Sequence, residues 1–176
     1  MIRSLLALAV TASLSTAALA ELEPGETAPD FTVSGFQAGE PVDFTLSEAL
    51  ESGPVVLFFF PAAFTDGCEA QAASFAESIE DFHALGAQVI GVTAGNTERL
   101  ADFSTQHCAD AFPVFAIADD MMSEYEVRLM MRPGWTQRTT YVIGTDQTIV
   151  LEYTELNPYE HVDRSLEALR TLAGGQ

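Results

Sequence analysis

The pattern of apolar and polar residues alternates along the chain between short strand-like runs and helical spacing. Residues 55–60 are consecutively apolar and have a proline on each side, which predicts a central strand buried on both faces. Helical spacing follows, because apolar residues then recur every three or four positions, at Ala72, Phe75, Ala76, Ile79 and Phe82. Gly86 is expected to end this helix.

The same reading predicts the other elements in chain order. Further strands are expected at 31–33, 42–44, 88–93, 112–117, 138–143 and 148–153. Further helices are expected at 47–50 with Ser47 as N-cap, from about 97, at 119–127 and around 162–169. Strands and helices that alternate in this way predict an α/β fold, with a central mixed sheet and helices on both faces.

The first twenty residues have the features of a secretory signal peptide. Arg3 supplies a positive charge, residues 5–19 are apolar and rich in alanine, and Ala18-Leu19-Ala20 places small residues at the cleavage site. We therefore expect a signal peptide at 1–20, one domain at 21–176, and export, with a bacterial periplasm as the destination. No later stretch is long and apolar enough to predict a membrane span.

The charge of the chain is strongly acidic. It has 26 Asp and Glu against 7 basic residues, all of them Arg, and a formal net charge of −19. Such a field repels nucleic acid and anionic membrane surfaces, so neither is expected as a partner. It is otherwise typical of a well-solvated surface.

Cys68 is the candidate for chemistry. It follows the buried strand and stands at the start of the predicted helix, where unpaired backbone N–H groups favour the thiolate form. The Thr65 hydroxyl can point toward the sulfur, Pro61 can cover it, and Arg138 opens a strand that could lie alongside and supply a cation. The alternative is a small cysteine that is simply buried in a turn.

The loop Pro61-x-x-x-Thr65-x-x-Cys68 resembles the active-site loop of peroxiredoxins. Residues 25–31 resemble the N-terminal entry of that family, and 138–143 resemble the strand that carries its active-site arginine. The resemblance spans most of 25–170. It implies a thioredoxin fold and a thiol peroxidase that needs no cofactor or metal. Cys68 would be the peroxidatic nucleophile, Thr65 and Arg138 would hold the peroxide, and Pro61 would shield the sulfur.

The resemblance is closest to the bacterioferritin-comigratory (Q-type) and alkyl-hydroperoxide-reductase E types. Many Q-type members have a resolving cysteine five positions after the nucleophile, where this chain has Ala73. Cys108, the other cysteine, could resolve the oxidised Cys68, as a cysteine in a similar helix does in some Q-type proteins. Alternatively, an outside thiol resolves it, or the two cysteines form a permanent structural disulfide. The implied partners are a peroxide and a thioredoxin-like or other thiol reductant, with the chain a monomer or homodimer.

Two other classes of function compete with a peroxidase. A thioredoxin-type thiol–disulfide oxidoreductase would normally carry a CxxC motif, but position 65 is Thr. A non-catalytic module would use the two cysteines only to form a structural disulfide. The His107-Cys108 pair and the two Met pairs, at 121–122 and 130–131, are weak indications of a metal site.

Overall fold

The computed structural model describes residues 22–175, and the expected signal peptide lies outside them. Its single sheet has seven strands: β1 (Thr32–Gln37), β2 (Glu40–Thr45), β3 (Val55–Phe59), β4 (Gln88–Thr93), β5 (Val114–Ala116), β6 (Thr139–Ile143) and β7 (Ile149–Thr154). The α-helices are α1 (Leu46–Leu50), α2 (Asp66–Glu77), α3 (Ile79–Ala84), α4 (Leu100–Gln106), α5 (Asp119–Glu124) and α6 (Glu160–Gly174), and a 3₁₀ turn, Thr97–Arg99, leads into α4.

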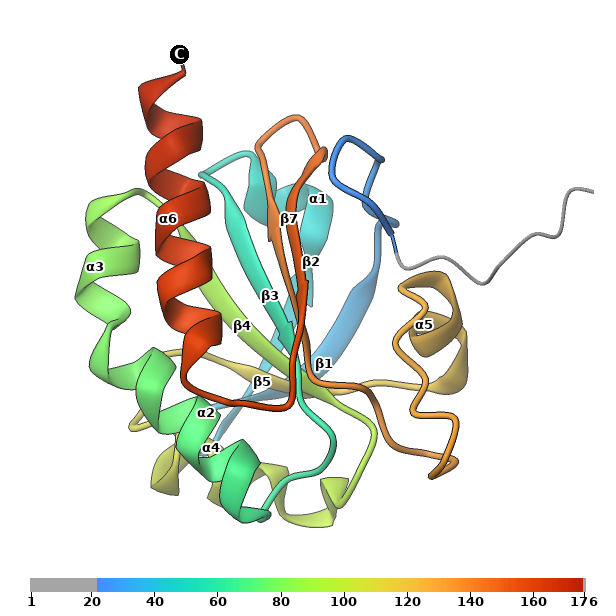
Figure 1. The fold of residues 1–176 in the computed structure, drawn as a ribbon. Coiled ribbons are helices and arrows are strands. Elements are labelled where there is room, and N and C mark those ends of the chain that lie inside the picture. Colours follow the sequence, from blue (N-terminus) through green and yellow to red (C-terminus); the bar gives the residue numbers. More distant parts are fainter. Residues whose placement is uncertain (1–21, 176) are drawn as a thin grey trace, which may run out of the picture.

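The strand order in space is β2-β1-β5-β4-β3-β6-β7. β3 is central, and it pairs in parallel with β4 and antiparallel with β6. The sheet is therefore mixed, as the sequence predicts, and the α/β thioredoxin-type fold is confirmed (Figure 1).

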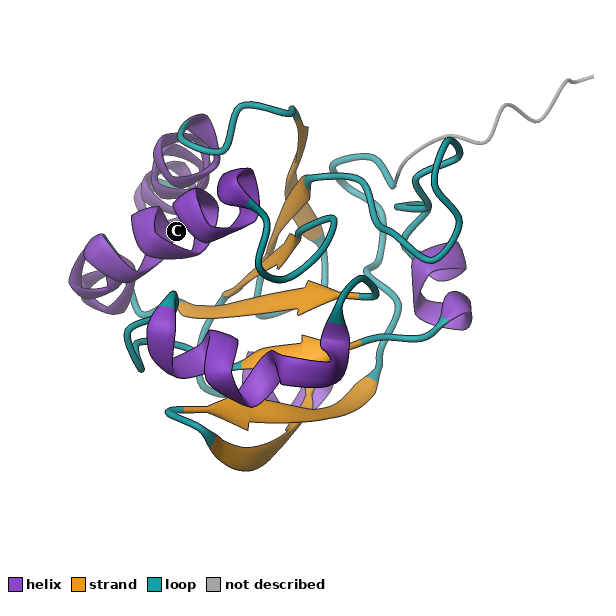
Figure 2. Ribbon diagram, turned by 90° about the horizontal axis from the view of Figure 1, so that it is seen from below, coloured by secondary structure: helices purple, strands orange, loops and turns teal. Residues whose placement is uncertain are grey.

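Helices cover both faces of the sheet because β3 is apolar on both. Val56 and Phe58 join the core beneath α2, α3, α4 and α6, whereas Val55, Leu57 and Phe59 join the core beneath α1 and α5. Figure 2 shows these helices on opposite sides of the strands. It also looks onto the end of the sheet where β3 leads into α2.

Two details of the prediction are wrong. The helix expected across 72–82 is interrupted at Ser78, whose N–H bonds to Phe75 O only three residues back, so α2 ends and α3 begins. Ser47 is not an N-cap: Thr45 occupies that position, and the Ser47 N–H and hydroxyl both donate to the Asp30 carboxylate. Within residues 22–175 no helix has both the length and the apolar character needed to cross a membrane.

Candidate active site

Cys68 is the third residue of α2, in the first turn of that helix. Its backbone N–H donates to the carbonyl of Thr65, the N-cap residue, at 2.8 Å. The positive end of the helix dipole therefore lies at this cysteine. Only 1% of Cys68 is exposed, so the residue is almost completely shielded from solvent in this conformation.

The fold brings Arg138 to Cys68. Arg138 immediately precedes β6, and Thr139 pairs with Phe59 at the end of β3, so the arginine lies where the Cys68 loop begins. Arg138 Nη2 lies 3.7 Å from Cys68 Sγ, and Nη1 donates to Gly67 O at 3.1 Å. With 6% of the residue exposed, the guanidinium is a buried, fixed positive charge beside the sulfur.

Gln71 is a site residue that the sequence reasoning missed. It is fully buried one helical turn after Cys68, and its Oε1 accepts a hydrogen bond from Arg138 Nη1. Its position on the helix face of Ala72 and Phe75 is the signal that could have found it, because a polar residue there needs a buried partner. Among the described residues, Gln71 Nε2 and Arg138 Nε have no hydrogen-bond partner.

Thr65 and Pro61 lie in the loop between β3 and α2, as expected. The Thr65 hydroxyl donates its hydrogen to Ala62 O at 3.0 Å, so its oxygen is left to accept a hydrogen bond. Two bonds from the loop after β4 hold this segment, because Ala63 N donates to Gly95 O and Asn96 Nδ2 donates to Ala63 O.

Phe64 connects the loop to α4. It has a left-handed backbone with φ of 57°, a strained conformation for a bulky residue. Its ring meets Phe103 and His107 edge-on, and the Arg99 guanidinium lies 4.6 Å from the ring centre. His107 Nε2 also lies 3.4 Å from Glu69 Oε1 in the first turn of α2. These contacts fix the loop against α4.

A cavity of about 220 Å³ opens beside Arg138. Its lining residues are Pro61, Leu129, Thr136, Gln137, Arg138, Thr154, Glu155 and Leu156. One wall is held by Thr136, whose hydroxyl donates to Phe60 O at 2.8 Å. The cavity therefore gives a small molecule access to the guanidinium that contacts the sulfur.

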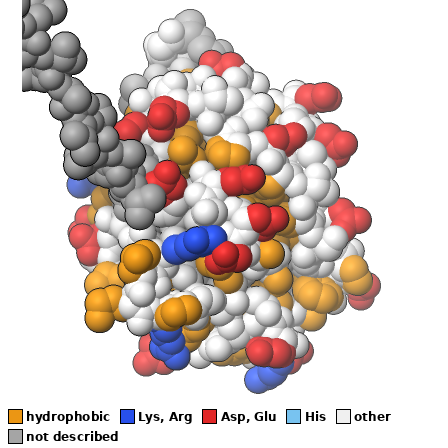
Figure 3. Space-filling view, turned by 90° about the vertical axis from the view of Figure 1, so that its right-hand side faces the viewer, with side chains coloured by type: hydrophobic (Ala, Val, Ile, Leu, Met, Phe, Trp, Pro, Cys, Tyr) orange, Lys and Arg blue, Asp and Glu red, His pale blue; other side chains and the backbone are white. Residues whose placement is uncertain are grey.

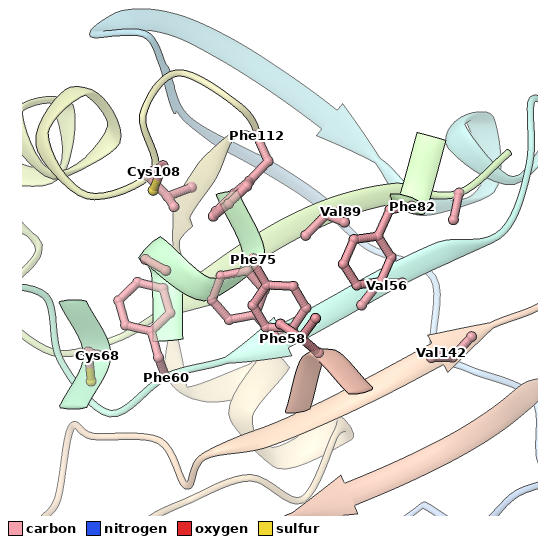
Figure 4. Packing of buried hydrophobic residues seen from close by; sticks show 14 of the residues in the cluster. Val56, Phe58, Phe60, Cys68, Phe75, Phe82, Val89, Cys108, Phe112 and Val142 are labelled. Carbon is pink, nitrogen blue, oxygen red and sulfur yellow. The ribbon is translucent and has the colours of Figure 1, made fainter. Parts of the chain in front are cut away.

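Cys108 lies just beyond α4 and is fully buried. Burial, with a smaller contribution from the Asp110 charge, raises the pKa of its thiol far above the ordinary value. Both thiols are free, and Figure 4 shows the two sulfurs well apart, with the Phe60 ring between them in that view. In this conformation Cys108 is a protonated thiol that does not touch Cys68.

No group of three or more His, Cys, Asp or Glu side chains within residues 22–175 is arranged to hold a metal ion. Met130 and Met121 belong to the two Met pairs that weakly indicated a metal site; Met130 is exposed whereas Met121 is buried, so the pairs lie in different environments. The chemistry that this site can support is that of a buried thiol beside a fixed cation.

Comparison with known proteins identifies the family. Residues 24–152 match the AhpC/TSA family. A putative peroxiredoxin of Mycobacterium tuberculosis is 31% identical over 88% of this chain and its own full length, and peroxiredoxin Q of Sedum lineare is 30% identical over 87% of this chain and 81% of its own.

A solved structure agrees with these sequence matches. The crystal structure of peroxidoxin BcpB from Mycobacterium tuberculosis has a TM-score of 0.74 at 30% identity, and the match covers 85% of this chain and 97% of that one. The chain therefore belongs to the AhpC/TSA family, and it is a peroxiredoxin, an oxidoreductase.

Proposed function

We propose that the chain reduces hydrogen peroxide or organic hydroperoxides with Cys68 as the peroxidatic nucleophile. The observation that carries the proposal is the 3.7 Å contact between Arg138 Nη2 and Cys68 Sγ. A permanent positive charge at this distance stabilises the thiolate and, in the transition state, the negative charge on the leaving oxygen. The family supports peroxide as the substrate class.

In the proposed reaction the Cys68 thiolate attacks one oxygen of the O–O bond. The S–O bond forms as the O–O bond breaks, so Cys68 becomes a sulfenic acid and the peroxide leaves as water or an alcohol after taking up a proton. Arg138 and the Thr65 hydroxyl orient the two oxygens, and Pro61 limits the access of water. Gln71 and Gly67 position Arg138 by accepting its Nη1 hydrogen bonds.

Cys108 is proposed to resolve the sulfenic acid by forming a disulfide with Cys68. The turn that carries Cys108 is suited to rearrangement, because Ala109 and Asp110 both have left-handed backbones, with φ of 46° and 61°. The bonds from Cys108 N to Phe103 O and from Asp110 N to Ser104 O are long, at 3.4 Å each. Unwinding this turn would expose the thiol and lift the burial that keeps it protonated.

The test is to mix the reduced protein with one equivalent of hydrogen peroxide and measure the products by intact mass and peptide mapping. Cys68→Ser should abolish peroxide consumption, and Cys108→Ser should leave the first turnover intact. A Cys68→Ser protein that consumes peroxide at the wild-type rate would refute the proposal. If a sulfenic acid persists on Cys68 while Cys108 can still be alkylated, the resolving group is an outside thiol and not Cys108.

Export to a periplasm is also part of the proposal. It rests on the sequence of residues 1–20 and on the family match, which starts at residue 24. An exported thioredoxin-like reductant would then be needed to restore the dithiol in an oxidising compartment. Expression of the whole chain in a bacterium, followed by fractionation and N-terminal sequencing, tests cleavage after Ala20. A chain that keeps Met1 in the cytoplasmic fraction would refute it.

A further inference from the structure

His161 is fully buried in the first turn of α6, and both of its ring nitrogens are bonded. Nε2 lies 2.9 Å from the carbonyl of Glu155, and because a carbonyl only accepts, Nε2 carries the hydrogen. Nδ1 lies 2.8 Å from the Thr140 hydroxyl, which therefore donates to it when the ring is neutral. The two bonds tie α6 to β6 and to the segment after β7.

Both partners of His161 belong to the segments that hold Arg138. Thr140 follows Arg138 by two residues, and Glu155 N donates to Arg138 O at 3.2 Å. The histidine therefore joins β6 to the end of β7 beside the residue whose guanidinium contacts Cys68.

The bond between His161 and Thr140 depends on the charge of the imidazole. A proton on Nδ1 turns this acceptor into a donor, so the Thr140 hydroxyl must turn its own hydrogen away from the ring. The new charge would also oppose the Arg138 charge and lie at the positive end of the α6 dipole. Protonation therefore weakens the bonds that hold Arg138 in place.

The charged and titratable groups around His161 are Arg138 before β6, Tyr153 of β7, Glu155 after it, and Glu160 and Arg164 of α6. Burial, with the Arg138 charge, lowers the pKa of His161 from its ordinary 6.5, whereas Glu155 and Glu160 oppose the shift. Acidic side chains are spread over the surface, as Figure 3 shows for one face, but carboxylates ordinarily titrate near pH 4. Apart from the Cys68 thiol, a histidine is therefore the group expected to alter this site between about pH 5 and pH 8.

We propose that His161 is a positioning residue, which in its neutral form fixes Arg138 beside Cys68 through Thr140 and Glu155. This inference rests on the proposed function and names a residue that regulates its site. When His161 takes up a proton, Arg138 shifts from the position in which Nη2 lies 3.7 Å from Sγ. Since a misplacement of about 1 Å can cost about 10²-fold in rate, a smaller shift should cost about tenfold.

The first test removes the hydroxyl that bonds to His161. Thr140→Val keeps the branched shape and should slow the oxidation of Cys68 by hydrogen peroxide about tenfold at neutral pH. Thr140→Ser is the matched variant, because it keeps the hydroxyl and should recover most of the rate. In an Arg138→Lys protein, Thr140→Val should slow oxidation no further, because both changes act through one contact.

The second test uses His161→Gln and follows the pH dependence of the same rate. Each rate is divided by the thiolate fraction of Cys68, read from its ultraviolet absorbance, so that ionisation of the thiol cancels. The wild type should react about tenfold faster than His161→Gln at about pH 7.5, and this advantage should disappear near pH 5, where protonation weakens the same bonds. His83→Gln changes an exposed histidine and should follow the wild type at every pH.

The contrary outcomes separate this inference from the function on which it rests. If Thr140→Val reacts like the wild type, or slows the Arg138→Lys protein as much, His161 does not act through Arg138 and the inference is wrong. It is also wrong if the advantage over His161→Gln is the same at both pH values, because a purely structural role predicts that result. If hydrogen peroxide does not oxidise Cys68 in the wild type at any pH, the proposed function itself fails.

Discussion

Replacing Arg138 by lysine tests whether the shape of the cation matters as well as its charge. Arg138 uses Nη1 for Gly67 O and Gln71 Oε1, and Nη2 for Cys68 Sγ. A lysine ammonium is a single donor centre on a flexible stem, so it cannot reproduce this planar arrangement. If the lysine ammonium contacts the sulfur, Gln71 Oε1 loses its hydrogen-bond partner. If the ammonium donates to Gln71 Oε1 instead, the sulfur loses its contact with a cation.

The magnitude follows from the donor that is lost. Removing one preorganised donor from a buried site that stabilises developing negative charge costs about 2.7–4 kcal/mol in the transition state. Since about 1.36 kcal/mol corresponds to a factor of ten, Arg138→Lys should slow Cys68 oxidation by roughly 10²- to 10³-fold. The unpaired Gln71 oxygen should lower the free energy of unfolding by about 1–3 kcal/mol.

The assay is the second-order rate of Cys68 oxidation by hydrogen peroxide, measured in single turnover and followed by intact mass. Arg170→Lys is the control, because Arg170 lies exposed on α6, and it should react at the wild-type rate. An Arg138→Lys rate within threefold of the wild type would show that positive charge alone suffices, and the argument from guanidinium geometry would be wrong.

Three further predictions concern the neighbourhood of the site. Gly67→Ala would place a Cβ 3.0 Å from Arg138 Nη2, so oxidation should slow about tenfold while urea unfolding stays unchanged. Burial, assisted by the Arg138 charge, lowers the pKa of His161 from its ordinary 6.5, although its bond to a backbone carbonyl opposes this. The stability from neutral His161 is therefore complete above about pH 6.5 and lost as pH falls below it, so His161→Gln should flatten the fall in the urea midpoint between about pH 7 and pH 5. Amide hydrogen exchange should be faster in residues 107–111 than in 67–71.

Each of these predictions has a control or a contrary outcome. Gly174→Ala adds the same methyl group where nothing lies within 4 Å, and it should leave the oxidation rate unchanged. His83→Gln removes an exposed histidine, so a pH dependence altered equally by both histidine variants would contradict the argument from burial. Equal exchange in the two segments would mean that the Cys108 turn is no looser than the start of α2.

The sequence predicts the central strand well because burial on both faces leaves an uninterrupted apolar run at 55–60. It misses the break at Ser78 because the apolar spacing continues in phase from Phe75 to Phe82, and both residues enter the same core. A periodic pattern reports which face is buried, but not whether the backbone hydrogen bonds are continuous. Only the local turn at Ser78 decides that.

Only part of the candidate site, likewise, could be predicted from the sequence. Cys68 could be proposed from local pattern, since a strand followed by a helix places it at the helix start. Its contact with Arg138 joins residues 70 positions apart, and without the family resemblance no periodicity indicates it. Gln71 was missed because a single glutamine in a helix ordinarily points to solvent. Here Gln71 lies on the buried face of α2 and accepts a hydrogen bond from a buried arginine. That contact is decided by tertiary packing and not by the local sequence.

The contacts that hold Cys68 beside Arg138 also oppose the approach of Cys108. Arg138 ties the start of α2 to β6 through Gly67 O, and the Phe64 ring locks the same loop against α4. The Cys108 side is held less firmly, by long backbone bonds and a turn with two left-handed residues. If Cys108 resolves Cys68, we therefore expect the end of α4 to unwind first, which also breaks the contacts of His107 with Phe64 and Glu69. On the proposed mechanism, Arg138 would then remain in contact with Cys68 until the peroxide has reacted, because its bond to Gly67 O does not involve α4.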